Sequence, residues 1–178
     1  MEVWIAAADS AAKPTPAPTV ANTAKITNSA STKYIYNIIA DDEPRASNDG
    51  RTYFDWWPRN GCSAAAPAGS GGSSGGQARP CSTSEWIEMT FAKPSTVSEA
   101  QVYWFDDTGR GGVRVPKSWR LLYKNGADWK PVDAIGDYGV AKDAYNTVHF
   151  KAVTTSALRL ELVMQPNVSA GVQRWKVK

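Results

Sequence analysis

The sequence has one histidine, two cysteines and no long apolar run, and each scarcity excludes a class of site. With the single histidine, His149, the chain cannot assemble a zinc site from several Cys and His ligands. The Ser-His-Asp and Cys-His catalytic arrangements would depend on that one side chain as well. No apolar segment approaches the roughly 20 residues that a transmembrane helix needs. We therefore expect no membrane partner.

Neither sign of charge is in large excess, which argues against a nucleic-acid binder. The chain has 20 basic and 17 acidic residues, giving a formal net charge of +3. A protein that binds nucleic acid usually has basic residues clustered on one face. This balance offers no electrostatic basis for such a face, and we expect no nucleic-acid partner.

The motifs that accompany catalysis are also missing. There is no G-x-S-x-G elbow, and "GRGG" at 109–112 lacks the Lys-Ser/Thr ending of a phosphate-binding loop. Two acidic pairs remain, Asp41-Asp42 and Asp106-Asp107. Adjacent residues on an extended backbone point in opposite directions, so neither pair is by itself the facing dyad that glycoside hydrolysis requires. One acid from each pair could converge, which keeps a small enzyme as a third hypothesis, but we expect no catalytic residues.

Aromatic residues, in contrast, are abundant. The 178 residues are 42% hydrophobic, which is enough for one domain with a real core, and they include eight Trp and seven Tyr. Large amphipathic rings dominate both protein cores and binding surfaces. For any single Trp, burial in the core is the simpler interpretation.

The two cysteines, Cys62 and Cys81, flank a segment that has too few apolar side chains to fold by itself. The intervening "SAAAPAGSGGSSGGQARP" contains almost no large apolar groups. A bridge between its ends would remove loop-closure entropy worth roughly 3 kcal/mol. The sequence predicts a disulfide and hence an oxidising compartment, secreted or periplasmic. Two unrelated free thiols are the alternative.

Composition divides the chain into three parts. Residues 1–5 resemble the end of a preceding domain, and residues 6–22 have the Ala/Pro/Thr composition of a linker. Residues 23–178 are expected to form the folded domain. The glycine- and serine-rich segment at 62–81 is expected to be an insertion within it.

The folded part has the period-two pattern of antiparallel strands. In "EWIEMTF" the side chains of Ile87, Met89 and Phe91 are expected on one face, and "ALRLELVM" alternates in the same way. Asn125-Gly126 in "KNGADW" is a typical hairpin turn. No long segment has helical periodicity. The sequence therefore predicts an all-β fold, an antiparallel β-sandwich whose two sheets bury each other's apolar faces.

Two loops contain the residue types that bind sugars. A sugar needs an aromatic face for its C–H surface and rigid polar groups for its hydroxyls. "RTYFDWWPRNG" at 51–61 and "QVYWFDDTGRGGVRVPKSW" at 101–119 supply both. The alternatives stay open: Trp56 or Trp57, with Trp104, fills the end of the core, and the loop's acids and arginines pair with one another instead of with a ligand.

The order of these segments resembles a known family. "YFDWWPRNG", "EWIEMTF", "VYWFDDTGRGGVRVPKSWRLLYKNGADWKPV", "YNTVHFKAVTTSALRLEL" and "SAGVQRW" together resemble the discoidin-like (F5/8 type C-like, galactose-binding-like) C-terminal domain of bacterial glycoside hydrolases. The likeness is closest to enzymes of the β-L-arabinofuranosidase type. It implies an eight-stranded jelly roll whose loops at one end bind carbohydrate. Mapped onto this sequence, the carbohydrate-binding residues are Trp56, Trp57, Asp106, Asp107, Arg110 and Arg114.

The same resemblance implies a possible structural calcium ion. Asp41 or Asp42 matches the position of a ligand in the loop after the first strand. The glutamate expected in the final segment is absent, because Gln173 and Arg174 stand there. Calcium requires several oxygen ligands, and an arginine repels it.

Taken together, these features predict a non-catalytic carbohydrate-binding module. It would hold an attached glycoside hydrolase near plant or microbial polysaccharide, as part of a secreted or periplasmic bacterial enzyme. The alternative is a structural accessory domain that packs against its own catalytic domain and stabilises it. Aromatic residues and arginines suit that role as well, since both are enriched at protein interfaces.

Overall fold

The fold is given by a computed structural model, which describes residues 20–30, 35–40, 56, 58–63 and 81–178. The predicted remnant at 1–5 and most of the linker at 6–22 lie outside these residues, so that division of the chain stays a prediction. No helix among the described residues has the length and apolarity to cross a bilayer. The described elements are β1 (Lys25–Asn28), the 3-10 helix η1 (Ile35–Ile39), β2 (Ser84–Phe105), β3 (Val113–Arg114), β4 (Ser118–Asn125), β5 (Asp128–Pro131), β6 (Ala134–Ile135), β7 (Tyr145–Val163) and β8 (Ser169–Val177).

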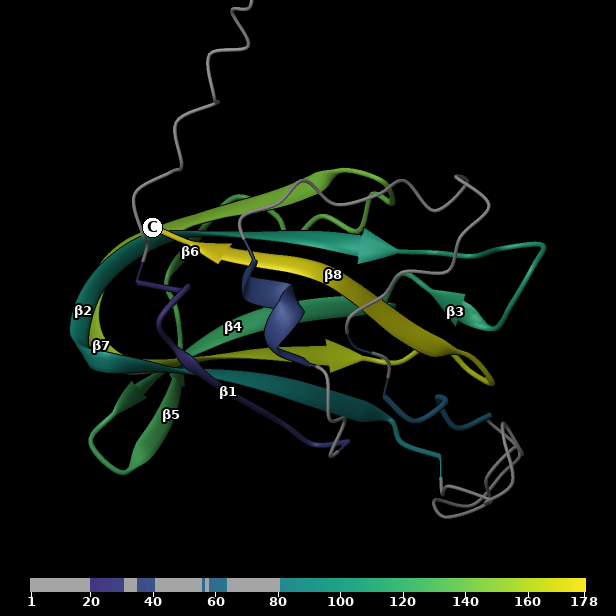
Figure 1. The fold of residues 1–178 in the computed structure, drawn as a ribbon, viewed down its shortest axis with the longest axis horizontal. Coiled ribbons are helices and arrows are strands. Elements are labelled where there is room, and N and C mark those ends of the chain that lie inside the picture. The colour runs from purple at the N-terminus through teal and green to yellow at the C-terminus, as the bar shows by residue number, and fades with distance from the viewer. Residues whose placement is uncertain (1–19, 31–34, 41–55, 57, 64–80) are drawn as a thin grey trace, which may run out of the picture.

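Two long strands, β2 and β7, form the frame of the molecule. They pair antiparallel along almost their whole length, with two shifts of register between residues 90 and 99 of β2. Both strands bend sharply at the same end of the molecule, and each therefore runs through two layers (Figure 1). Pro94, which has no N–H to donate, lies in this bend.

The remaining strands extend the two layers. One layer has the order β1-β2-β7-β4-β5, and in the other β6, β7, β2, β8 and β3 lie side by side. The predicted all-β sandwich is confirmed. Two details differ from it: the strands form one continuous folded sheet because β2 and β7 belong to both layers, and β3 pairs parallel with β8.

The apolar alternation in the sequence marks the core correctly. The residues that alternate with the apolar ones along the two strands are only partly buried: Trp86, Glu88, Arg159 and Glu161. The residues that alternation placed inward are all buried: Ile87, Met89, Phe91, Leu158, Leu160, Leu162 and Met164.

Three further features lie at the ends and edges of the strands, and the first confirms the predicted hairpin turn. The β4–β5 hairpin turns at Gly126, which has a φ of 62°. β2 ends at Phe105, so residues 101–105 of the segment predicted as a loop belong to this strand. The side chain of His149 is 62% exposed, and its Nδ1 lies 3.7 Å from Oε2 of Glu99. His149 is thus a solvated strand residue.

Leu160 offers a test of the core. Its backbone pairs with Ile87 on one side and Leu121 on the other, and its side chain is fully buried. We expect Leu160→Ala to lower the free energy of unfolding by about 2–5 kcal/mol, because a cavity would remain between the layers. Urea unfolding followed by Trp fluorescence measures this loss. The matched control is Val163→Ala, whose side chain is 43% exposed; equal losses in the two variants would contradict the assigned core.

Candidate functional site

The loops predicted to bind a ligand lie at one end of the sandwich. β2 and β7 both bend at the opposite end, so each begins and ends here (Figure 1). Five segments meet at this end: residues 106–112 after β2, residues 136–144 before β7, residues 164–168 before β8, and the two segments joined by the disulfide. We call this region the loop end.

Asp106 is the first residue of the loop after β2, and both of its carboxylate oxygens accept hydrogen bonds from within that loop or from the residue just after β3. One carboxylate oxygen accepts hydrogen bonds from the backbone N–H (2.9 Å) and hydroxyl of Thr108, and the other accepts from the N–H of Val115 (3.3 Å). Burial by itself would raise the pKa of Asp106. The hydrogen bonds and the positive charge of Arg114 outweigh it, so the pKa lies below its usual value.

Asp107 closes the same loop from the inside. Its Oδ1 accepts hydrogen bonds from the N–H of Val113 (2.8 Å) and from Nη1 of Arg114 (3.1 Å). Its backbone carbonyl accepts from the N–H groups of Arg110 and Gly111. A Cβ at position 111 would lie 2.1 Å from Oδ2 of Asp107, so the loop has no room for a side chain there.

The two arginines of the loop differ in their availability. Nη1 of Arg114 also lies within hydrogen-bond distance of the carbonyl oxygens of Gly111 and Val113, and 24% of its side chain is exposed. Arg110 is exposed, and its guanidinium group has no partner among the described residues. The acids and Arg114 therefore brace the loop, and Arg110 is the cation that the loop presents to solvent.

The structure decides the orientation of three tryptophans. Trp56, expected to bind carbohydrate, is fully buried, and its backbone exchanges two hydrogen bonds with Val172. A buried ring has no face to offer a sugar, so this assignment is corrected. Trp104 and Trp119 are core residues as well, and both indole N–H groups donate to the carbonyl of Gly139. Trp57, the other candidate ring, lies outside the described residues.

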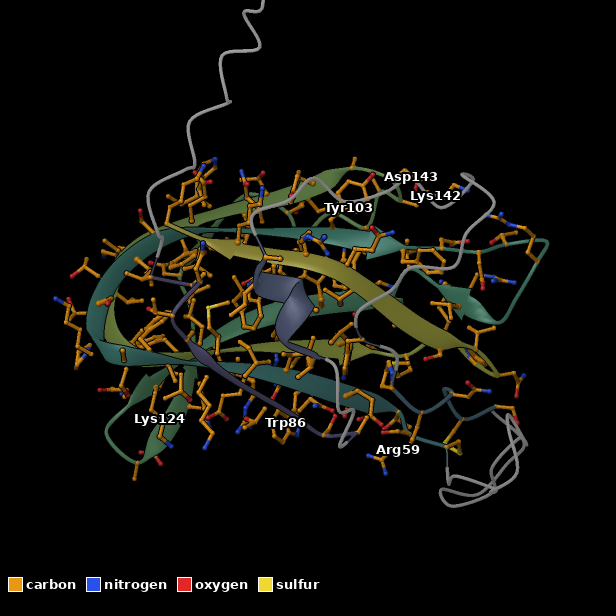
Figure 2. The ribbon with its side chains drawn as sticks, in the orientation of Figure 1. Arg59, Trp86, Tyr103, Lys124, Lys142 and Asp143 are labelled. Carbon is orange, nitrogen blue, oxygen red and sulfur yellow. A yellow bond between two sulfur atoms is a disulfide. The ribbon has the colours of Figure 1, made fainter. Side chains whose placement is uncertain are left out.

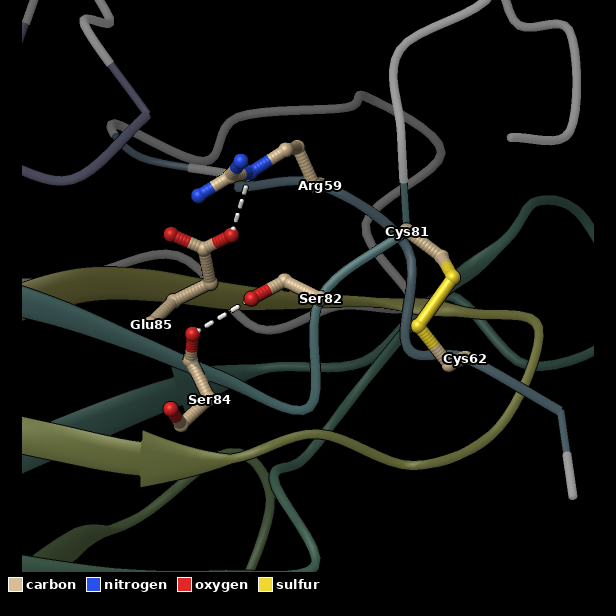
Figure 3. Close-up of a disulfide and its surroundings, with 6 residues drawn as sticks. All are labelled: Arg59, Cys62, Cys81, Ser82, Ser84 and Glu85. Atoms are coloured by element: carbon tan, nitrogen blue, oxygen red, sulfur yellow. Dashed lines mark hydrogen bonds and ion pairs between the residues drawn. A yellow bond between two sulfur atoms is a disulfide. The ribbon is translucent and has the colours of Figure 1, made fainter. Parts of the chain in front are cut away.

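The predicted disulfide is present between Cys62 and Cys81, and it closes the insertion at the loop end (Figure 3). Beside it, Nε of Arg59 donates to Oε1 of the fully buried Glu85 at 2.6 Å. The hydroxyl of Ser29, just after β1, donates to the other carboxylate oxygen. Three separate segments are thus tied together through one buried acid, which serves the structure of this end.

One segment of the loop end was missed by the sequence interpretation. Lys142 and Asp143 lie in the turn before β7 (Figure 2). The buried side chain of Asn146 holds this turn by bonding to the N–H and C=O of Ala141 and to the carbonyl of Ala144. The signal was present in "YNTVHF", because a polar residue occupies the inward phase there and must be satisfied by hydrogen bonds.

The calcium prediction falls largely outside the described residues, which include neither Asp41 nor Asp42. Gln173 and Arg174 are buried in β8, and Nη1 of Arg174 donates to the carbonyl of Gln173. Within the described part of the chain, no three potential metal ligands gather. A calcium ion stays a prediction that depends on the first-strand loop.

No protein-family model and no curated protein matches this sequence. The backbone, however, is similar to solved structures. One belongs to the Streptococcus pneumoniae beta-galactosidase BgaA (TM-score 0.63, 16% identity, covering 90% of this chain and 94% of that one). A second is chitosan-binding module 1 of a chitosanase/glucanase from Paenibacillus sp. IK-5 (TM-score 0.55, 12% identity, 91% and 99% covered). A third is a pectin-binding carbohydrate-binding module (TM-score 0.51, 14% identity, 86% and 88% covered).

The fold is the β-sandwich of these solved structures, two of which are named as carbohydrate-binding modules. The match extends over nearly the whole length of each, so the likeness concerns the complete domain and not a fragment of it. At these identities it establishes the fold, in agreement with the discoidin-like expectation. The finer likeness to β-L-arabinofuranosidases stays a prediction.

Asp106 predicts a specific dependence of stability on pH. Its pKa in the folded state is lowered from 3.8, so the ionised carboxylate stabilises the fold above that value, and this contribution is lost as the pH falls through the folded pKa. We expect Asp106→Asn to be less stable than the parent protein at pH 6. The difference in unfolding free energy should shrink below pH 3.8. Urea unfolding at pH 6 and at several pH values below 3.8 measures it, and a constant difference would contradict the hydrogen-bond network described.

The disulfide predicts a loss of stability on its removal. Because the bridge joins cysteines 19 residues apart, we expect a Cys62→Ser/Cys81→Ser variant to have a free energy of unfolding about 3 kcal/mol lower than that of the parent protein. Chemical denaturation of the oxidised, reduced and double-variant proteins provides the comparison. The reduced protein should match the variant, whereas a loss of less than about 1 kcal/mol would mean that the insertion is already held without the bridge.

Proposed function

We propose that this chain is a non-catalytic carbohydrate-binding module that holds an attached glycoside hydrolase near polysaccharide. The observation that carries the proposal is the fold likeness to whole modules named for binding chitosan and pectin. Such a module acts by raising the effective concentration of its catalytic partner at the substrate, and needs no chemistry of its own.

The loop end is the proposed binding site, with roles that differ from those expected from sequence. Arg110 is exposed and offers guanidinium donors to sugar hydroxyls, and Arg114 presents its partly exposed side. Asp106 and Asp107 hold the loop in shape. Trp57, which lies outside the described residues, keeps the aromatic role that the sequence resemblance implies, because the buried Trp56 cannot fill it.

The biological setting follows from the same reasoning. The ligand is plant or microbial polysaccharide, and the partner is the module's own catalytic domain in a bacterial parent enzyme, of the β-L-arabinofuranosidase type. The Cys62–Cys81 disulfide supports a secreted or periplasmic location, where such bonds persist.

Binding to polysaccharide tests the proposal directly. We expect the purified protein to bind at least one of chitosan, pectin and arabinan in affinity electrophoresis. Arg110→Ala should weaken that binding about tenfold, because a charge-assisted hydrogen bond to the ligand is lost. The matched control is Lys93→Ala, an exposed cation in the bend at the opposite end of the sandwich, which should bind like the parent.

Two outcomes would overturn this proposal. The first is folded protein that retains no affinity for any of these polysaccharides. The second concerns the parent enzyme: if deleting residues 23–178 destabilises it on soluble substrate without selectively impairing its action on insoluble substrate, the domain is a structural accessory to the catalytic domain.

A further inference from the structure

The outer face of the β1-β2-β7-β4-β5 layer carries a row of aromatic and basic side chains remote from the β2–β3 loop. The register places the side chains of Trp86 and Glu88 in β2, Arg159 in β7, and Lys124 and Trp129 in the β4–β5 hairpin on this one face. Figure 2 shows Trp86 and Lys124 on the outer side of the layer. We call it the Trp86–Trp129 face.

The two tryptophans of this face are linked by one guanidinium group. The Cζ atom of Arg159 lies 4.7 Å from the ring centroid of Trp86 and 4.3 Å from that of Trp129. Nζ of Lys124 lies 5.1 Å from the same Trp129 ring. Cations and rings thus follow one another across the strands, and both rings stay partly exposed to solvent.

The charge of the face is predominantly positive. Its two carboxylates are already paired, Glu88 with Arg159 (3.1 Å) and Glu161 with Arg120 (2.7 Å). Lys124 has no carboxylate partner among the described residues, and the same holds for Lys25, which the register places on this face opposite Thr90. Four cations therefore stand against two carboxylates in the part of this face that the structure describes.

We infer that the Trp86–Trp129 face binds an acidic polysaccharide chain, such as a polyuronate, as a second contact surface. The inference rests on the proposed function and deepens it by naming the charge class of the glycan. The partly exposed rings provide apolar surface for sugar C–H groups. The cations left over after internal pairing provide charge for carboxylates. Because the row crosses several strands on an open face, it suits an extended chain better than a single sugar unit.

Arg120 shows how the face would take a carboxylate. Its side chain is 60% exposed, and the bond to Glu161 uses Nε and Nη2. Its Nη1 has no partner among the described residues and is available to a ligand, and Lys124, four residues further along β4, adds a longer-range attraction. Interactions of this exposed kind are screened by salt, which gives the surface a measurable signature.

The test compares binding of polygalacturonate with binding of its carboxyl-reduced, neutral form. We expect Trp129→Ala and Lys124→Gln each to weaken binding of polygalacturonate about fivefold in isothermal titration. Lys124→Gln, which removes only a charge, should leave binding of the neutral polymer almost unaffected. Raising NaCl from about 20 mM to about 500 mM should weaken polygalacturonate binding by the parent protein. Lys151→Gln is the charge-matched control, an exposed lysine in the other layer, and it should bind like the parent.

The remaining outcomes separate this inference from the proposed function. Neutral glycan bound through the loop end, with no affinity for polygalacturonate, overturns the inference and leaves the proposed function standing. Polygalacturonate binding that is lost in Arg110→Ala but unchanged in Trp129→Ala and Lys124→Gln overturns it too, since the ligand then sits at the loop end alone. Equal binding of poly-L-glutamate with the same sensitivity to these variants overturns the assignment to glycan, and identifies a surface for acidic proteins.

Discussion

The pairing of β2 with β7 is the constraint on which the rest of the structure depends. The two strands stay paired through a shared bend, and their register, which shifts twice there, sets which side chains face inward in each layer. A slip of one residue would turn Ile87 and Leu160 to solvent, and the register is therefore strongly fixed by the core. The bend also closes one end of the sandwich, which leaves the opposite end for the long connecting loops. The position of the candidate site thus follows from how two strands fold.

How much of this could be predicted from sequence depends on the range of the interaction. The alternation in "EWIEMTF" and "ALRLELVM" reports a local property, the side of the strand on which each residue lies, and it was correct. The continuity of β2 through "AKPST" is not a local property. A proline such as Pro94 normally interrupts a strand. Only the long-range pairing with β7 shows that the chain bends there and that the strand continues. A sandwich could therefore be predicted, whereas a single folded sheet could not.

The candidate site was harder to predict. Alternation shows that adjacent side chains point in opposite directions, but it does not show which of them points into the core. Two adjacent tryptophans indicate that one points inward, and the hydrogen bonds between Trp56 and Val172 are needed to decide which. The disulfide was more accessible, since two cysteines at the ends of a segment without apolar residues form a pattern that needs no tertiary information. Asn146 could be predicted in part: the alternation of the strand indicated that its side chain points inward, but not which loop that side chain holds.

The same residue types recognise sugars and brace loops, so the number of hydrogen bonds already made decides between the two roles. A loop lacks the backbone ladder of a sheet, and its N–H and C=O groups need side-chain partners. Asp106, Asp107 and Arg114 meet that need, which leaves Arg110 as the residue of the β2–β3 loop free to meet a ligand. Strands need no such help, because the ladder already satisfies their backbone. An outward row such as Trp86, Arg159 and Trp129 therefore cannot be explained by backbone requirements. In this fold, residues available for recognition are therefore to be sought on the exposed face of a strand as well as among the few loop side chains that make no internal hydrogen bonds.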